Sequence, residues 1–334
     1  MILIIKYNKY NNQQCILIKL LIKGGFMNNF QKILNEVKKA VNGKDRAIIT
    51  TLLAILANGN ILIEDIPGVG KTTMAIAFSK ALGLKYGRVQ FTPDTLPSDI
   101  TGFAVYNKES GKITFNKGAI FCNLFLADEL NRTSSRTQAA LLEAMEEQQV
   151  TVEGRSYPLE KPFSVIATQN PAGASGTQLL PDSQVDRFMV KISMGYPDSD
   201  AECKMLLNRS QSNPLDNINR VVTKEDLIEM QNCVKQVYVK KEIAEYIVAL
   251  VSATRNNDLI SRGASPRATL SLTEMAKSAA FASNKDFVVP QDVQNVFLST
   301  ISHRVILSSE AVSRQLSAEQ ILKNILSRVK PPRI

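Results

Sequence analysis

One short glycine-rich segment, Asp65–Thr73, holds the residue types that bind a triphosphate. Gly68 and Gly70 let backbone N–H groups approach one point closely, and the N-terminus of a following helix adds partial positive charge. Lys71 supplies a full charge to the β- and γ-phosphates, and Thr72 offers a hydroxyl to Mg²⁺. The predicted ATP-binding residues are Asp65, Pro67, Gly68, Val69, Gly70, Lys71, Thr72 and Thr73.

The segment departs from the strict phosphate-loop pattern at its first position, which is Asp65 where glycine is usual. The alternative reading is therefore a glycine-rich turn with a chance Lys-Thr pair. The flanking residues favour the phosphate loop, because an apolar strand, Ile61–Glu64, precedes it and a helical stretch, Thr72–Ala81, follows it.

A second carboxylate-bearing pair follows the apolar run Leu124–Ala127. Asp128 at the end of a buried strand can hold Mg²⁺ opposite the loop, and Glu129 can orient and polarise the attacking water. Alone, such a pair often marks a strand that runs into a solvated turn, but its place downstream of a phosphate loop favours catalysis.

Three further polar residues are candidates for the same site. Asn170 follows another apolar run and could position the water, although a turn residue is the plain alternative. Arg187 could equally form a surface ion pair. Arg267 begins a predicted helix, where a cation is mildly unfavourable, so a function would explain its presence. Arg132 receives no definite role.

Strands and helices must alternate to position these residues, and the hydrophobic pattern predicts that they do. This alternation predicts an α/β fold with a parallel sheet sandwiched by helices and two inserted hairpins, at residues 102–117 and Gln149–Tyr157. The predicted strands are Ile61–Glu64, Tyr86–Phe91, Leu124–Ala127, Phe163–Thr168 and Phe188–Ile192, and the predicted helices are Phe30–Val41, Ala47–Ala57, Thr72–Ala81 and Ser135–Gln148.

After Pro197 the pattern becomes helical, so we predict a nucleotide-binding domain over residues 27–197 and a small all-α domain over residues 198–334. The predicted helices of the second domain are Ala201–Arg209, Lys224–Lys235, Lys240–Arg255, Ala268–Asn284 and Pro290–His303.

Residues 1–26 differ in composition from the rest of the chain. Lys23-Gly24-Gly25 can be encoded by codons that resemble a bacterial ribosome-binding site just before Met27. We therefore expect the natural protein to begin at Met27 and residues 1–26 to be a translated leader; a disordered basic tail is the alternative. The intact mass of the natively expressed protein distinguishes the two.

The composition excludes several other classes of protein. The four cysteines are far apart and form no C-x-x-C pair, which favours reduced thiols and a cytoplasmic protein. His303 is the single histidine, which argues against Ser-His chemistry and multi-histidine metal sites. The first 26 residues carry +4 of the net charge of +9, and the diffuse +5 that remains disfavours nucleic-acid binding. The longest apolar run near the start, Ile16–Ile22, is too short to insert in a membrane.

Taken together, these motifs make the chain resemble the MoxR family of AAA+ ATPases from about residue 30 to 310. The strings that carry the resemblance are Ile63–Thr72, Leu126–Arg132, Gln138–Glu147, Ala167–Pro171, Asp186–Phe188 and Gly263–Ala268. The resemblance implies that Lys71 and Thr72 belong to Walker A and that Asp128 and Glu129 form Walker B. It also implies that Asn170 is sensor 1, Arg187 the arginine finger and Arg267 sensor 2, and that residues 198–334 form a lid.

An arginine finger supplied by a neighbour implies a homo-oligomeric ring, which we expect to be a hexamer with ATP at its subunit interfaces. The family further implies chaperone-like remodelling or maturation of client proteins, often with partners that carry a von Willebrand factor A domain. Three alternatives stay open: a nucleic-acid motor, an ATPase subunit like that of magnesium chelatase, and a scaffold that binds ATP without hydrolysing it. DNA-stimulated activity, tetrapyrrole assays and phosphate release, respectively, distinguish them.

Overall fold

The computed structural model describes residues 28–108, 111–171, 179–197, 199–200, 202–203 and 213–333. The predicted leader and most of the predicted helix Ala201–Arg209 lie outside these residues. The predicted domain boundary lies between residues 197 and 198, and residue 198 is also outside the described ranges.

A five-stranded parallel sheet forms the centre of the first domain, in the strand order β2-β5-β8-β1-β9. The parallel arrangement brings the carboxyl ends of the strands to one edge, where the loops that follow them meet. The five strands are β1 (Ile61–Glu64), β2 (Tyr86–Gln90), β5 (Leu124–Asp128), β8 (Ser164–Gln169) and β9 (Val190–Ile192), each within two residues of its prediction.

Alternate residues of the central strands enter two separate hydrophobic cores, one on each face of the sheet. In β1, Ile61 and Ile63 face one core while Leu62 faces the other, as the two-residue period of a strand requires. A helix over 28–38, α3 (Asp45–Leu56) and α4 (Lys71–Ala81) cover the first face; α5 (Pro97–Thr101) and α6 (Ser135–Glu147) cover the second. The predicted sandwich of helices around a parallel sheet is confirmed.

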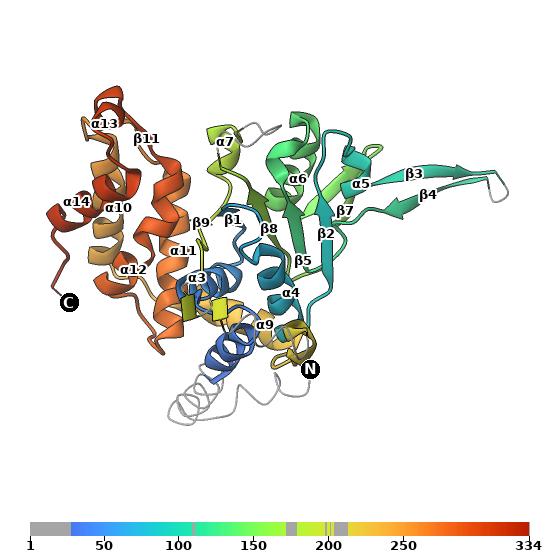
Figure 1. Ribbon diagram of the computed structural model, residues 1–334, viewed down its shortest axis with the longest axis horizontal. Coiled ribbons are helices and arrows are strands. Elements are labelled where there is room, and N and C mark those ends of the chain that lie inside the picture. The colour runs from blue at the N-terminus through green and yellow to red at the C-terminus, as the bar shows by residue number, and fades with distance from the viewer. Residues whose placement is uncertain are drawn as a thin grey trace.

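Two antiparallel hairpins are inserted between these elements, as the sequence predicts. The first pairs β3 (Gly102–Asn107) with β4 (Lys112–Lys117) and extends well away from the domain (Figure 1). The second pairs β6 (Gln149–Val152) with β7 (Arg155–Pro158) and turns at Gly154, whose φ of +72° favours glycine.

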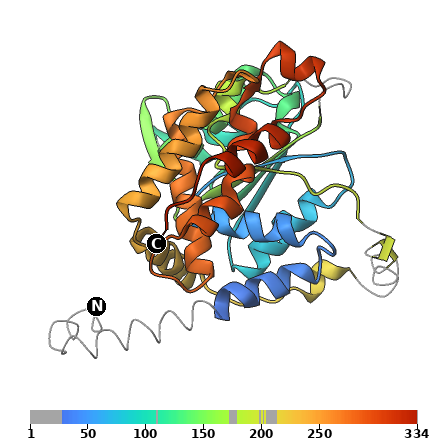
Figure 2. The ribbon, with the colours of Figure 1, turned by 90° about the vertical axis from the view of Figure 1, so that its left-hand side faces the viewer.

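The C-terminal part is a bundle of helices that packs beside the sheet domain and shares its first hydrophobic core (Figures 1 and 2). Buried faces of these helices stabilise the bundle, and reciprocal side-chain caps begin α9 and α14. The helices are α9 (Lys224–Gln236), α10 (Lys241–Arg255), α11 (Pro266–Ala282), α12 (Pro290–Ile301), α13 (Ser309–Ser313) and α14 (Ala318–Arg328), with the short helix η4 (Ser302–Arg304) after α12.

The sequence prediction missed several short elements. It gave no strand to β10 (Ile260–Arg262) and β11 (Ile306–Leu307), which form a two-stranded ladder inside the helical part. It also missed the five-residue α13 and the four-residue α7 (Asp182–Val185), and one longer helix, the 11-residue α14. Among the described residues, no helix is both long and apolar enough to cross a membrane.

Candidate active site

The glycine-rich segment lies between β1 and α4, with the geometry that phosphate binding requires. Gly70 is the N-cap of α4 and has a φ of +94°, and Gly68 has a φ of +87°. A Cβ at Gly68 would meet no atom within 4 Å, so the loop borders open space. Gly68, Gly70 and the first residues of this 11-residue helix line one cavity, and the first N–H groups of a helix have no acceptor within it.

Lys71 is buried, and its Nζ donates a hydrogen bond to the backbone oxygen of Asp65 at 2.6 Å. Burial lowers the pKa of Lys71, while the carboxylates of Asp65, Asp128 and Glu129 act in the opposite direction. The ammonium group is thus held across the loop, close to the negative charges that also face the cavity.

Asp65, the unusual first residue of the loop, ties the loop to the segment after β9. Its carboxylate accepts hydrogen bonds from the backbone N–H groups of Met194 and Gly195, both at 2.6 Å, and from the Ser193 hydroxyl at 3.0 Å. It also accepts the N–H of Ile66 at 2.9 Å. Burial alone would raise the pKa of Asp65, but these hydrogen bonds outweigh it and leave the pKa below its ordinary value.

Asp128 ends β5 and is fixed from two sides. The Thr168 hydroxyl donates to its Oδ1 at 2.7 Å, and Arg88 Nη2 on β2 forms an ion pair with its Oδ2 at 2.8 Å. Because β5 lies between β2 and β8, the sheet itself brings these three residues together. Thr168 and Arg88 carried no signal in the sequence, since each belongs to an ordinary strand pattern.

Glu129 has a φ of +58°, a conformation that residues other than glycine rarely adopt. Its N–H donates to the Thr168 hydroxyl at 2.8 Å, so one threonine fixes both members of the Asp128-Glu129 pair. Its carboxylate accepts from Arg132 at 2.7 Å and from the Asn170 amide at 3.3 Å. The hydrogen bond from Arg132 is the main reason that the pKa of Glu129 lies below its ordinary value.

Asn170 lies after β8 and is buried, and Asn131 holds its backbone through two hydrogen bonds, at 3.3 and 3.4 Å. Its Oδ1 is buried without a protein partner. An unpaired buried acceptor is unfavourable, so it indicates a place for a water molecule or a ligand beside Glu129.

Two adjoining cavities surround these residues. One of about 250 Å³ is lined by the loop together with Asp128, Glu129 and Asn170. The other, of about 700 Å³, shares Pro67, Gly68, Gly70 and Thr73 with the first and continues past Lys44 and Tyr196. The sequence analysis missed this second cavity, because Lys44 and Tyr196 meet only in the fold, where Lys44 Nζ donates to the backbone oxygens of Gly195 and Tyr196.

The two candidate arginines lie together in a separate cluster. Arg187 follows α7 and Arg267 is in the first turn of α11, and both pair with Glu146 of α6, at 3.1 and 2.6 Å. Neither arginine lines the two cavities at the loop. The structure therefore brings together the loop, Asp128, Glu129 and Asn170, and it places Arg187 and Arg267 elsewhere.

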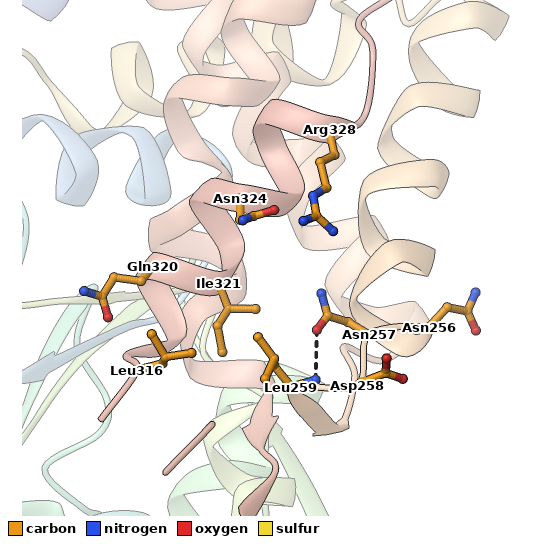
Figure 3. A pocket seen from close by; sticks show the side chains of 9 residues that line it. All are labelled: Asn256, Asn257, Asp258, Leu259, Leu316, Gln320, Ile321, Asn324 and Arg328. Atoms are coloured by element: carbon orange, nitrogen blue, oxygen red, sulfur yellow. Dashed lines mark hydrogen bonds between the residues drawn. The ribbon is translucent and has the colours of Figure 1, made fainter. Parts of the chain in front are cut away.

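A further hollow of about 470 Å³ lies in the helical bundle, between the end of α10 and α14 (Figure 3). Asn257 accepts the N–H of Leu259 there at 3.0 Å, and the lining residues include amides, apolar side chains and one residue of each charge (Figure 3). It is larger than the cavity beneath the loop but has one cation, Arg328, and no glycine-rich turn. The chemistry of phosphate binding therefore favours the loop over this hollow.

The oxygen donors near the loop fit Mg²⁺. The Thr72 hydroxyl and the Asp128 carboxylate border the same cavity. Among the residues that the structure describes, no group of three or more His, Cys, Asp or Glu side chains could hold a metal ion by itself. One carboxylate and one hydroxyl suit Mg²⁺, which takes its other ligands from phosphate oxygens and water.

Comparison with known proteins agrees with this geometry. Residues 60–190 match the model of the ATPase family associated with various cellular activities (AAA), and residues 252–325 match the AAA lid domain. A solved structure described as a putative ATPase from Cytophaga hutchinsonii has a TM-score of 0.88 at 38% identity, covering 95% of this chain and 99% of that one. The fold is thus an AAA ATPase domain followed by an AAA lid domain.

Two relatives extend over nearly the whole chain. YeaC of Bacillus subtilis is 43% identical over 90% of this chain and 94% of its own length. Chaperone MoxR1 of Mycobacterium tuberculosis is 34% identical over 92% of this chain and 84% of its own length. The chain belongs to the MoxR family of AAA+ ATPases, as the sequence motifs imply.

Proposed function

We propose that this protein is a Mg²⁺-dependent ATPase that works as a homo-oligomeric ring and drives the remodelling or maturation of client proteins. The observation that carries the proposal is the convergence of Lys71, Thr72, Asp128, Glu129 and Asn170 on one cavity beside an anion-binding loop. Walker A and Walker B residues that meet in this way support hydrolysis as well as binding.

In this proposal each residue of the cavity has a distinct task. The loop amides and Lys71 bind the β- and γ-phosphates. Glu129 is ionised near neutral pH, because its pKa is lowered, so its carboxylate can accept a hydrogen bond from the attacking water. Asn170, which already donates to Glu129, has a free acceptor oxygen for the same water. When bound, Mg²⁺ held by Thr72 and Asp128 would neutralise charge on the phosphates.

The second cavity supports nucleotide binding on the other side of the loop. At about 700 Å³ it has room for a nucleoside, and its wall includes the apolar side chains of Val41, Val69 and Leu215. Lys44 and Tyr196 border it, and Asp65 holds the Tyr196 segment against the loop through Met194 and Gly195. We propose that the base and ribose lie here.

The separate cluster at Glu146 supports assembly. A phosphoryl-transfer site needs cations to stabilise the charge that develops, and Arg187 and Arg267 do not line their own cavity. We propose that both arginines act at the site of a neighbouring subunit. There they would leave their ion pairs with Glu146 and bind phosphate oxygens of the neighbour's nucleotide instead. A head-to-tail contact of this kind forms a ring when its rotation closes and an open helix when it does not, and we propose a closed ring of six subunits.

The work that hydrolysis performs is proposed from the relatives. One of them is named a chaperone. We extend that role to this chain and propose client proteins, including partners with a von Willebrand factor A domain. A Glu129→Gln variant with ATP should retain its client, and mass spectrometry of the captured proteins would identify it.

Phosphate release by mixed variants tests the proposed site. Lys71→Ala should abolish nucleotide binding, Glu129→Gln should retain binding and slow turnover by about 10²-fold or more, and Arg187→Ala should be inactive alone. Mixing Lys71→Ala with Arg187→Ala subunits should restore activity, because one supplies the arginine and the other the intact cavity. Unchanged turnover by Glu129→Gln would remove its catalytic role. A mixture without activity would contradict donation between subunits.

A further inference from the structure

A buried arginine of the lid domain donates hydrogen bonds to the backbone on both sides of Arg187. The side chain of Arg304, in η4, is 1% exposed. Its Nη2 donates to the backbone oxygens of Asp186 at 3.1 Å and of Phe188 at 2.7 Å. Its Nε also forms an ion pair with the Asp186 carboxylate at 3.0 Å. These three contacts therefore hold the residues immediately before and after Arg187.

The same guanidinium is anchored inside the lid domain. Arg304 Nη1 donates to the backbone oxygen of Thr300 at 3.0 Å, and Nη2 donates to the Ser271 hydroxyl on α11 at 3.0 Å. Arginine suits this task, because its planar group presents five donors in a fixed fork that lysine lacks. The side chain therefore connects two lid helices rigidly to the segment that carries Arg187.

His303 adds a second contact at the same place. Its Nε2 lies 3.0 Å from the backbone oxygen of Phe188, and a carbonyl only accepts, so Nε2 carries the proton. Burial, and then the charge of Arg304, hold the pKa of His303 well below its ordinary value. The neutral ring keeps this hydrogen bond without adding a second buried charge beside Arg304.

Local structure around Arg187 is too weak to place it without such contacts. The preceding α7 has four residues and no buried side chain, and a helix of one turn has little stability of its own. By contrast, Phe188 is fully buried, and the backbone between it and Asp186 is gripped by the lid. The backbone position of Arg187 thus depends on the lid domain, while its side chain also pairs with Glu146 of α6.

Burying a cation here is unfavourable unless its partners compensate, and burial lowers the pKa of Arg304 to about 10. It remains charged at neutral pH, and Asp186 provides the counter-charge. Ser265 of the lid domain donates to the other oxygen of Asp186 at 2.9 Å, so the lid domain holds both oxygens of this carboxylate. Five contacts from three lid residues, Arg304, His303 and Ser265, therefore converge on Asp186 and Phe188.

We propose that Arg304 is a positioning residue for hydrolysis in the neighbouring subunit: it transmits the orientation of the lid domain to Arg187. This inference rests on the proposed function, in which Arg187 acts between subunits. The orientation of the lid domain in one subunit would then affect the rate of hydrolysis in the next subunit. Substitution of Arg304 should therefore change kcat with little change in the KM for ATP.

A mixing experiment places the substitution in one kind of subunit at a time. The acceptor subunit carries Arg187→Ala and keeps its own cavity; the donor subunit carries Lys71→Ala and supplies Arg187. Arg304→Gln in the donor should lower kcat about 10- to 100-fold with KM within about twofold, because a misplaced catalytic group loses rate and not ground-state binding. The same substitution in the acceptor should change kcat by less than about twofold.

The controls separate positioning from folding. Arg314→Gln in the donor replaces an exposed lid arginine that pairs with Glu310, and should leave kcat unchanged. Arg304→Lys keeps a buried positive charge but lacks the planar donor group of arginine. It is the donor variant to use if the Arg304→Gln donor does not fold. Equal losses in donor and acceptor would overturn the inference. Inactivity of the parent mixture, without any substitution at Arg304, would instead overturn the proposed function.

Discussion

Replacing Asp65 by glycine would restore the usual first residue of a phosphate loop, yet we expect it to damage this protein. The Asp65 carboxylate accepts four hydrogen bonds, two of them from the backbone of Met194 and Gly195 at 2.6 Å. Glycine removes all four and leaves these donors without their acceptor. It also adds backbone freedom to the unfolded chain, which destabilises the fold further.

The expected magnitude follows from the two shortest contacts. A hydrogen bond to a charged group contributes about 1.5–3 kcal/mol, so the Met194 and Gly195 bonds together contribute about 3–6 kcal/mol. Gly195 is partly exposed and water can replace part of its bond, so we take the lower end, about 3 kcal/mol. At about 2–4 °C per kcal/mol, the melting temperature should fall by about 6–12 °C.

Thermal unfolding and ATP binding measure the effect of Asp65→Gly. Nucleotide affinity should also fall, because glycine keeps the backbone oxygen that holds Lys71 but loses the side-chain hydrogen bonds that fix this part of the loop. Asp65→Asn, which keeps an acceptor oxygen without the charge, should give a smaller loss. Asp94→Gly makes the same change in an exposed loop of the same domain and is the control. A melting temperature and affinity of Asp65→Gly equal to those of the unaltered protein would refute the reasoning.

Three further expectations concern the same site. Thr168→Val removes the hydroxyl that joins Asp128 to the Glu129 N–H, so kcat in phosphate-release assays should fall about tenfold or more while nucleotide affinity is retained; an equal kcat would exclude this role. Gly68→Ala and Gly154→Ala both place a side chain at positive φ with open space around it, so denaturant unfolding should show similar losses of about 1–2 kcal/mol, but a titration with ATP should show weaker binding for Gly68→Ala alone. Because the pKa of Asp65 is lowered in the fold, its stabilisation is present above the unfolded value of about 3.9 and is lost as pH falls through the folded value. The stability difference between the unaltered protein and Asp65→Asn should therefore shrink below about pH 4 in urea titrations; a difference that grows there would contradict this sign.

Most of the nucleotide-binding domain was predictable because its signals are local. Apolar runs of strand length end at Asp128 and near Asn170, and parallel strands bring such ends to one edge, so the meeting of these residues follows from their places in the sequence. The short strands β10 and β11 were missed because their pairing is not local in the sequence. The ladder of β10 and β11 joins residues more than 40 positions apart, and neither strand has enough residues to show a period.

The partners of the predicted residues were not predictable either. Thr168 and Arg88 occupy ordinary positions of β8 and β2, and only the order of strands in the sheet places them on either side of Asp128. Arg304 follows the single histidine at the end of a predicted helix, and nothing in the sequence distinguishes it from a surface arginine. Its burial against Asp186 depends on how the lid domain packs.

The sequence by itself predicted the chemistry that we propose for this protein: a loop for a triphosphate, a carboxylate pair for metal and water, and the strand and helix periods that hold them. These are decided by residue type and spacing along the chain. Only the tertiary structure decided which loop residue is tethered and which arginines lie apart from the cavity. Asp65 reaches Met194 and Gly195 across 129 and 130 positions of sequence, and Arg304 reaches Phe188 across 116. Contacts of this kind follow from the packing of strands and helices and leave no pattern along the chain.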